Sequence, residues 1–374
     1  MQNLTLTTSE KPTAIRGLSL QWLPPEADNR WDAFVSAHPL GLVYHLSAWK
    51  RVLEDTFPHI RGKFLVVYDT ETNQIQAGLP VYTVKSWLLG NRIVSIPFAS
   101  FCDPLISMPE QFRLLLGQIR DFAIRSRSRK IEIRSVRTTE QCSAPILGDS
   151  IQFKHHYLNL DRSIDVLYAS FAKSPIRQMV DRALRAGVMV EERFDEESLR
   201  ICHSVLVDTR RRRSLPPIPF RLFESMRHRL GRDHLKIFLA RHRGRSVAGL
   251  VALVFKDLWI SEHSGNSDFA IKGVNQLLYW ETIRRAHASG AKQFSLGRTA
   301  ATNNGLLEYK RRWGTVEEDL TYFNGVLTPT GRVADNPLRF AGGSWTSPVA
   351  KWLIGKAPVP VYHWVGRFCY RHLG

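Results

Sequence analysis

One stretch of the chain gathers the features that a group-transfer reaction needs. A glycine-started helix is predicted from Gly273 to Ser289, a short buried strand at Gln293 to Leu296, and a cationic turn at 303–314. A helix start offers unpaired N–H groups and partial positive charge, which suits phosphate. The turn supplies cations for a developing negative charge. Together the three features predict a group-transfer site.

Lys310 is the first catalytic candidate in this turn. Amide formation passes through a tetrahedral oxyanion, and a fixed cation beside that oxygen lowers the barrier. Losing one such donor commonly slows turnover about a hundred- to a thousand-fold. Because Arg311 and Arg312 stand beside it, a solvated basic face is the alternative interpretation.

Three further residues are candidates for binding the donor. Arg298, after the buried strand, could clamp a phosphate or carboxylate through two hydrogen bonds, and its alternative is an ion pair with Glu308 or Glu262. Gly273 and Asn275 at the helix start could hold the donor's phosphates. Their alternative is ordinary helix capping with close packing.

The attacking amine must also lose a proton, which requires a carboxylate or an imidazole near the acyl group. Glu262 and His263 lie on a predicted strand, Leu258 to His263. Because side chains alternate along a strand, we expect the two to face opposite sides and at most one to reach the site. Asn304 could contact a substrate amide, although Asn-Asn-Gly at 303–305 also suits a loop.

Two other groups are interpreted without a ligand. Arg210 to Arg213 end a predicted helix, where cations offset the helix dipole. Trp313 and Tyr279 stand at helical spacings and are assigned to the core.

The composition is that of a globular protein with an excess of basic residues. The 374 residues, 44% of them hydrophobic, suffice for two domains. With 52 Lys and Arg against 34 Asp and Glu, the net charge is +18, which attracts phosphates, anionic lipid or nucleic acid alike. The basic residues form many short clusters without a DNA- or RNA-binding motif, so DNA is not a predicted partner.

Cysteine usage and hydropathy place the protein in the cytoplasm. The four cysteines are widely spaced and form no Cys-x-x-Cys pair, so neither a metal site nor a disulfide framework is predicted. The N-terminus has no basic start followed by an apolar core. The longest strongly apolar run, Val247 to Phe255, is too short to span a bilayer.

The order of the predicted elements repeats along the chain. Both halves read as strands, a helix and a closing strand, after one or more helices. The predicted helices are Trp31–Phe57, Gln111–Arg125, Asp165–Ala186, Glu196–Arg213 and Gly273–Ser289; the predicted strands are Lys63–Tyr68, Gln76–Val84, Arg92–Phe98, Lys130–Arg134, Lys236–Ala240, Val247–Phe255, Leu258–His263 and Gln293–Leu296.

A duplicated unit explains this order. Aligning Gly78 with Gly249 gives an offset of 171 residues (249 − 78), and aligning Arg134 with Arg298 gives 164 (298 − 134). We therefore predict an α/β (α+β) fold of two tandem domains, each a mixed, mostly antiparallel sheet flanked by helices.

Three regions result from the repeat. Residues 1–150 form the first domain, 151–330 the second domain with the active site, and 331–374 a basic aromatic tail. No acidic residue occurs from Asn336 onward, and aromatic residues alternate there with Lys and Arg. This pattern favours an anionic membrane surface as a partner, and docking against the first domain is the alternative.

The sequence resembles the FemAB-like branch of the GNAT acyltransferase superfamily, a group also labelled BioF2-like or CelD-like acetyltransferases. The motifs that carry the resemblance are Gly273-x-Asn275, Ala286-x-x-x-Gly290, Phe294-x-x-Gly-Arg298 and Tyr309-Lys-Arg-Arg-Trp-Gly314. Weaker similarity to proteins of exopolysaccharide and exosortase systems rests on Gly78-Leu-Pro-Val-Tyr-x-Val-Lys85, Ser95-Ile-Pro-Phe98 and Pro358-Val-Pro-Val-Tyr-x-x-x-Gly366.

The resemblance implies tandem GNAT-like domains that transfer an acyl or aminoacyl group to an amine, with acyl-CoA or another acyl thioester as donor. It assigns oxyanion or phosphate contact to the lysine of a Phe/Tyr-Lys element, which Tyr309 and Lys310 match. The chain departs from the acyl-CoA signature Gln/Arg-x-x-Gly-x-Gly/Ala, because Ile271 to Gln276 keeps one glycine. It also lacks the long helical hairpin common in Fem enzymes, so tRNA is not the favoured partner.

The predicted function is an N-acyltransferase of cell-envelope or exopolysaccharide biosynthesis. Its acceptor is the amino group of a small molecule or of a lipid-linked precursor, and the tail would attach it to the inner membrane face. One alternative is Fem-type transfer from aminoacyl-tRNA to peptidoglycan. The other is a non-catalytic, membrane-associated scaffold with a degenerate GNAT fold.

Overall fold

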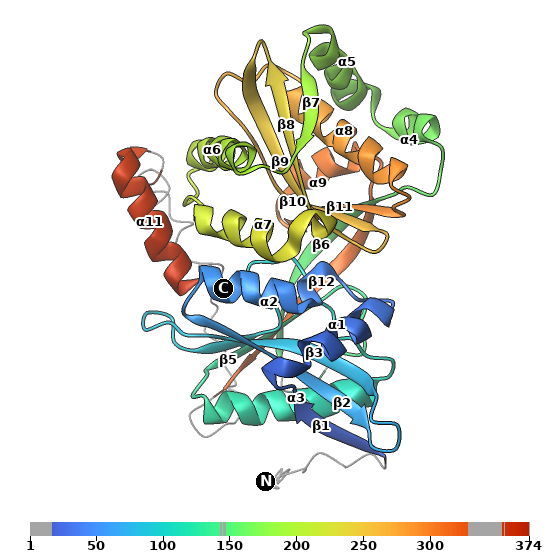
Figure 1. Cartoon of the computed structure of the whole chain (residues 1–374), viewed down its shortest axis with the longest axis vertical. Coiled ribbons are helices and arrows are strands. Elements are labelled where there is room, and N and C mark those ends of the chain that lie inside the picture. The colour runs from blue at the N-terminus through green and yellow to red at the C-terminus, as the bar shows by residue number, and fades with distance from the viewer. Residues whose placement is uncertain (1–16, 143, 145–146, 328–353, 355, 374) are drawn as a thin grey trace, which may run out of the picture.

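One twelve-stranded sheet runs through both halves of the molecule (Figure 1). The computed structural model describes residues 17–142, 144, 147–327, 354 and 356–373. The strand order is β1-β2-β3-β4-β5-β12-β6-β11-β10-β9-β8-β7. In chain order the strands are β1 (Leu18–Trp22), β2 (Ile60–Asp69), β3 (Ile75–Val84), β4 (Arg92–Val94), β5 (Lys130–Ser135), β6 (Asp149–Asn159), β7 (Met189–Arg193), β8 (Leu235–His242), β9 (Arg245–Phe255), β10 (Leu258–Asn266), β11 (Gln293–Ala300) and β12 (Val316–Val326).

Helices cover both faces of this sheet. In the first half α3 lies on one face and α1 and α2 lie on the other; in the second half α5 and α8 lie opposite α6 and α7. Apolar side chains of α2 and α7 join one core that both halves share. The described helices are α1 (Asp28–Ala37), α2 (Ser47–Thr56), α3 (Pro109–Arg125), α4 (Ile164–Ser170), α5 (Gln178–Arg185), α6 (Glu196–Arg212), α7 (Phe220–His234), α8 (Val274–Ala288), α9 (Asn304–Arg311) and α11 (Val359–His372).

The same series of elements occurs twice, as the tandem prediction requires. The order β1-α1-α2-β2-β3-β4-α3-β5 returns as β7-α6-α7-β8-β9-β10-α8-β11. Strands β4 and β5 are parallel, as are β10 and β11, whereas the other neighbouring strands are antiparallel. Each parallel pair needs a crossover connection, which α3 and α8 supply. The predicted mixed, mostly antiparallel tandem fold is thus confirmed.

Two glycines show the repeat at the level of single contacts. A Cβ atom on Gly78 in β3 would lie 2.5 Å from the Trp31 ring of α1, and one on Gly249 in β9 would lie 2.7 Å from Cys202 Sγ of α6. Cys202 follows Trp31 by 171 residues (202 − 31), the same offset that separates the two glycines. Both halves therefore use a glycine to bring a helix against the third strand of the unit.

Two strands cross between the halves. β6 follows the first unit along the chain, yet it pairs with β11 of the second unit. β12 ends the second unit, yet it lies between β6 and β5, pairing with β5 over residues 321–326. Neither strand was predicted from the sequence. The exchange joins the two units into one hydrogen-bonded sheet (Figure 1).

Two long helices predicted from the sequence are each divided. The helix expected at Trp31–Phe57 is split into α1 and α2 by a turn at 38–46, where a Cβ on Gly41 would lie 2.0 Å from the Val35 carbonyl oxygen. The helix expected at Asp165–Ala186 is interrupted at Pro175, which has no N–H to donate.

Helix α11 packs against both halves (Figure 1). Tyr362 Oη donates to the Leu215 carbonyl at 2.8 Å, and the Tyr370 ring stacks on Phe57 at 6.0 Å. The docking alternative therefore holds for this helix; residues 328–353, 355 and 374 of the predicted tail lie outside the described residues. Among the helices that the structure describes, none is long and apolar enough to cross a membrane.

The close glycine contact can be tested by Gly249→Ala. The added methyl group would also lie 3.2 Å from the Cys202 Cα atom, so the α6 backbone must move. We expect a loss of about 1–3 kcal/mol in the free energy of unfolding, measured by urea denaturation. Gly148→Ala is the control, because no atom of the described residues lies within 4 Å of a Cβ at that site. Equal stability of the two variants would contradict the packing role.

Candidate functional site

The parallel strands β10 and β11 separate partway along their length. They pair only from Leu258 to Ile260 and from Gln293 to Ser295. Beyond this point β10 pairs with β9 and β11 pairs with β6, and both strands carry a register shift. A gap therefore opens between two strands that begin side by side, next to the first turn of α8.

A cavity of about 740 Å³ occupies this gap. Among the residues that the structure describes, its wall contains three basic side chains and no carboxylate, together with several amides and hydroxyls. Its charge and hydrogen-bonding groups suit an anionic ligand such as a phosphate. The lining residues are Thr209, Arg213, Ser264, Gly265, Asn266, Asn275, Gln276, Tyr279, Leu296, Arg298, Asn303, Gly305, Leu306, Tyr309 and Lys310.

Lys310 extends from α9 to the backbone of β11. Helix α9 starts where the Asn303 side chain accepts a hydrogen bond from Leu306 N at 3.2 Å. Lys310 Nζ donates to the carbonyl oxygens of Gly297 at 2.8 Å and Arg298 at 3.1 Å. Burial and then the nearby Arg298 charge lower the pKa of Lys310 to about 7. The ammonium group can therefore both donate and lose a proton near neutral pH.

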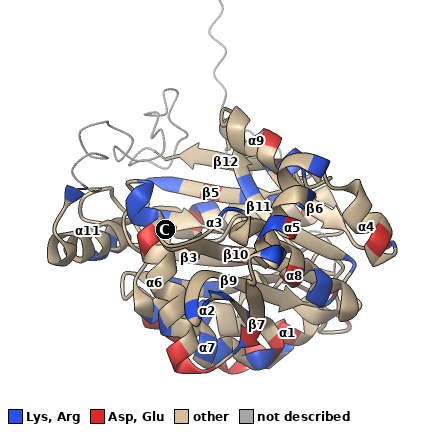
Figure 2. Ribbon diagram, turned by 90° about the horizontal axis from the view of Figure 1, so that it is seen from above, with Lys and Arg blue, Asp and Glu red and all other residues tan. Residues whose placement is uncertain are grey.

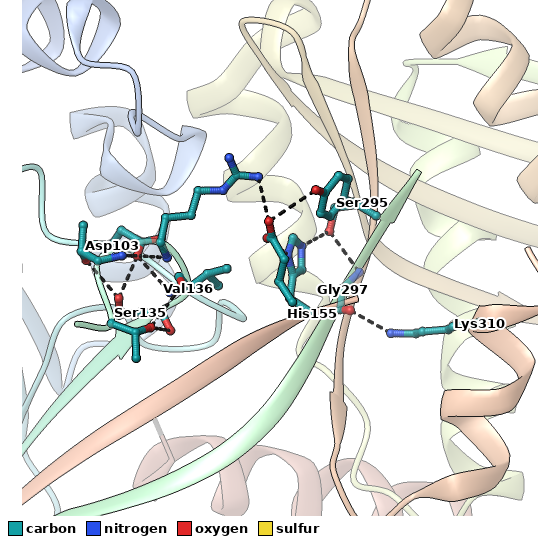
Figure 3. Close-up of polar contacts among 12 residues, drawn as sticks. Asp103, Ser135, Val136, His155, Ser295, Gly297 and Lys310 are labelled. Carbon is teal, nitrogen blue, oxygen red and sulfur yellow. Dashed lines mark hydrogen bonds and ion pairs between the residues drawn. The ribbon is translucent and has the colours of Figure 1, made fainter. Parts of the chain in front are cut away.

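A series of polar side-chain contacts fixes the position of Gly297, whose carbonyl oxygen Lys310 contacts (Figure 3). Gly297 has φ +72°, and its N–H donates to Ser295 Oγ at 3.1 Å. Ser295 Oγ lies 2.9 Å from His155 Nε2, and His155 Nδ1 lies 3.6 Å from Glu318 of β12. This Ser-His-Glu series resembles a hydrolase triad, yet Ser295 is completely buried. We assign it the positioning of β11.

The turn after β5 holds the last residue of this contact series, Glu318, in place (Figure 3). Arg137 lies 3.4 Å from Glu318 Oε1. Asp103 Oδ1 accepts hydrogen bonds from Ser135 Oγ and from the N–H groups of Val136 and Arg137, all at 2.8–2.9 Å. The first half of the chain thereby supports the cavity of the second half.

Arg298 lines the cavity without the ion pairs considered from the sequence. Glu308 binds Arg312 at 3.2 Å, and Glu262 accepts a hydrogen bond from Tyr44. The Arg298 guanidinium lies 4.7 Å from the Phe153 ring centroid. Within the described part of the chain it has no carboxylate partner, so its charge stays available to a ligand.

The first turn of α8 faces the cavity through Asn275 and Gln276. Gly273 caps the helix at φ +93°, and a Cβ there would lie 2.0 Å from the Met179 carbonyl oxygen. Close packing thus explains this glycine, which is not in the cavity wall. Asn304 also lies outside the wall, although Asn303 and Gly305 on either side belong to it.

Glu262 and His263 do not line this cavity. We expected them on opposite faces of β10, which is wrong because the register shift between Ser261 and His263 interrupts the alternation. Glu262 contacts Tyr44, and the His263 ring lies 5.3 Å from Phe223; both partners belong to the core shared by the two halves. Their role as proton acceptors stays a prediction that the cavity geometry does not favour.

Two cavity residues were assigned other roles from the sequence. Tyr279 was placed in the core and does pack against it, but it also lines the cavity, with its hydroxyl 3.0 Å from Ser261 Oγ and 2.9 Å from Ser264 Oγ. Arg213 was explained by the helix dipole. The spacing of Arg213 and Tyr279 in the sequence does not indicate that they line one cavity, because this depends on where β10 and β11 separate.

The corresponding gap in the first half is filled by the chain itself. After β4, Ser95 N donates to the Glu132 carbonyl at 2.9 Å and Cys102 N donates to the Arg134 carbonyl at 3.2 Å. The buried Arg134 side chain pairs with Glu132 at 2.7 Å and donates to Ala99 O at 2.6 Å. Backbone and side chain thus occupy the space that stays open beside β10.

A family model supports the assignment of the second half. Residues 170–311 match the acetyltransferase (GNAT) domain family. No curated protein matches the sequence significantly. The matched segment covers α5 to α9 and so includes most of the cavity wall.

Solved structures share the fold over nearly the full chain. FemX is 15% identical with a TM-score of 0.63, covering 82% of this chain and 97% of its own. A tandem GNAT protein from the clavulanic acid biosynthesis pathway is 13% identical with a TM-score of 0.53, covering 85% and 100%. A chain described as the C-terminal domain of a putative lysylphosphatidylglycerol synthetase from Agrobacterium fabrum is 14% identical with a TM-score of 0.50, covering 79% and 92%. The predicted tandem GNAT-like fold is confirmed.

The Tyr44–Glu262 contact predicts a pH-dependent stability. Removal from water raises the pKa of the half-buried Glu262 carboxyl to about 7, against a usual 4.5. The folded state therefore holds a proton that the unfolded state releases, and this contribution is lost as the pH rises from about 4.5 through about 7. At pH 8 we expect Glu262→Gln to be about 1–3 kcal/mol more stable than the wild type, and at pH 4 about equal.

Urea denaturation at both pH values measures the difference. Glu308→Gln is the control, because Glu308 forms an exposed pair with Arg312. A Glu262→Gln variant whose stability runs parallel to the wild type across this range would contradict the raised pKa.

Proposed function

Since residues 170–311 match the GNAT acetyltransferase domain family, we propose that the cavity between β10 and β11 is the active site of an N-acyltransferase using acyl-CoA or another acyl thioester. The observation that carries the proposal is a wall where the parallel strands separate, whose described residues include three cations and no carboxylate. In this proposal the unit within residues 151–330 is catalytic, and the unit within residues 1–150 supports it.

The cavity offers separate groups for the two ends of such a donor. Arg213 and Arg298 can bind phosphate groups through paired N–H donors. The first turn of α8, with Asn275 and Gln276, adds polar groups and the positive end of a helix. On the β10 side, Ser264 and Gly265 belong to the part of the strand that has no parallel neighbour, which suits the amide groups of an extended thioester arm. The backbone of the next residue, Asn266, is already hydrogen-bonded to Thr209.

Lys310 is the proposed catalytic cation. The acceptor amine attacks the thioester carbonyl, a C–N bond forms, and the tetrahedral oxyanion collapses as the C–S bond breaks. The proton lost by the amine ends on the leaving thiolate, so the products are an amide and a free thiol. A protonated Lys310 stabilises the oxyanion. Tyr279, whose hydroxyl is hydrogen-bonded to Ser261 and Ser264, is a further residue of the cavity wall that can carry a proton.

The acceptor is proposed to be an amino group of a cell-envelope or exopolysaccharide precursor. The structure related to a lysylphosphatidylglycerol synthetase supports a lipid-linked acceptor, as do the exosortase-associated, BioF2-like motifs. The site of action would be cytoplasmic, at the inner membrane face.

Acetyl-CoA with amino-sugar acceptors, assayed by release of free thiol, tests this function. We expect Lys310→Met to lower kcat about a hundred-fold with little change in the donor KM. Arg298→Gln should instead raise the donor KM, because it removes a phosphate contact. Arg312→Gln is the control, since Arg312 lies on the same segment and pairs with Glu308 at the surface.

The result also separates the alternatives. The net charge of +18 favours aminoacyl-tRNA as a second candidate donor. RNase-sensitive aminoacyl transfer without thiol release from acetyl-CoA would establish that donor. Full activity of Lys310→Met would refute the catalytic lysine, and no turnover with either donor would favour the scaffold.

A further inference from the structure

A row of aromatic rings runs along α11 and onto the loop after β3. Trp364 stacks on Phe368 at 5.6 Å between ring centroids. Phe368 lies 5.0 Å from His372, which lies 5.0 Å from Trp87. We call these four residues the aromatic ridge. The spacing 364, 368, 372 places its helical members on one face of α11.

The ridge exposes large apolar side chains to solvent. Trp87 is 74% exposed, Trp364 57% and the neighbouring Leu88 52%. Exposed aromatic groups of this size mark interaction surfaces, and tryptophan is favoured at the boundary between water and lipid. The other face of α11 is buried against the protein through Tyr362 and Tyr370.

The helix and the loop form one preformed surface. Ser86 Oγ accepts a hydrogen bond from Leu89 N at 2.9 Å and lies 2.9 Å from His372 Nδ1. Arg92 donates to the His372 carbonyl at 3.0 Å. The ring row is therefore held in place without a partner.

Positive charge surrounds the ridge. The segments 84–102, 122–131 and 354–373 contain no Asp or Glu, and the α11 ribbon carries no acidic colour in Figure 2. Within the described part of the chain, the exposed cations of these segments have no carboxylate partner. They are Lys85, Arg125, Arg127, Arg129, Lys356, Arg367 and Arg371.

A cleft adjoins the exposed tryptophan. It has a volume of about 350 Å³ and is lined by the loop 86–91 together with Arg127 and Arg129. Two arginines beside a tryptophan suit a phosphate diester with an apolar neighbour. That is the chemistry of a phospholipid headgroup at the membrane surface.

We propose that the aromatic ridge seats the protein on an anionic lipid bilayer, with the tryptophans at the interface and a headgroup phosphate in the Arg127–Arg129 cleft. Apolar rings alone would fit many partners, but the surrounding cations and the cleft lined by two arginines favour an anionic lipid surface. The aromatic rings would insert into the lipid interface and the basic residues would be attracted to the anionic headgroups. Neither interaction binds strongly alone.

The N-terminal end of α11 adjoins the segment that leads into the cavity wall. Arg211 donates to the Ala357 carbonyl, just before α11, at 2.7 Å, and Arg213 two residues later lines the cavity wall. A lipid-linked acceptor in the same bilayer would thus reach the acyl group from the surface on which the protein sits. This last step rests on the proposed function, whereas the membrane seat does not.

Vesicle co-sedimentation of the full chain tests the seat without any acyl donor. We expect binding to phosphatidylcholine vesicles that contain phosphatidylglycerol, much weaker binding without phosphatidylglycerol, and loss of binding at high salt. W87S/W364S and R127Q/R129Q should each lower the partition coefficient about tenfold or more. The matched controls are Phe269→Ser, an exposed aromatic side chain at 75%, and R243Q/R245Q in the β8–β9 turn.

A second measurement does not depend on weakened binding. Brominated lipid should quench part of the tryptophan fluorescence of the wild type, and W87F/W364F should bind as tightly but lose that quenching. Binding that ignores phosphatidylglycerol, or ridge variants that sediment like the controls, would overturn the proposal. Quenching that persists in W87F/W364F would do the same.

Discussion

The exchange of β6 and β12 is the constraint on which the rest of the structure depends. Antiparallel pairing of β12 with both β5 and β6 makes the two units one sheet. It also places His155 of β6 and Glu318 of β12 near β11. His155, which contacts Glu318, lies within hydrogen-bond distance of Ser295 Oγ, and Ser295 Oγ accepts the hydrogen bond of the Gly297 N–H. The carbonyl that Lys310 contacts is therefore set by strands from both halves.

Duplication has given the two units different tasks. In each unit a parallel pair begins side by side, but the chain after β4 returns into the first gap, and the buried Arg134–Glu132 pair fills it. The gap between β10 and β11 stays open, and the described residues of its wall include cations but no carboxylate. Two copies of one fold can thus differ in function when the segment after one strand, β4 or β10, fills the gap in one copy and leaves it open in the other.

The sequence was sufficient where a feature is local. Helical periodicity located α8, and the motifs around it brought Lys310, Arg298 and Asn275 together, as the cavity shows. The sequence was insufficient where a strand is determined by the strands with which it pairs. β12 opens on Val-Glu-Glu-Asp and β6 contains Lys-His-His, so neither shows a clear apolar alternation, and partners far apart in the chain determine both strands. The register shift that turns Glu262 away is likewise a property of two strands.

The strand exchange also defines what half of this chain would be. If the chain were cut between β6 and β7, the first piece would have an open edge at β5 and the second an open edge at β11. The strand that pairs with each edge, β12 for β5 and β6 for β11, would belong to the other piece. The protein is therefore equivalent to a strand-swapped dimer whose subunits have been fused. Fusion removes the need for both subunits to be identical, and it lets one of them lose its cavity while the assembly keeps its shape.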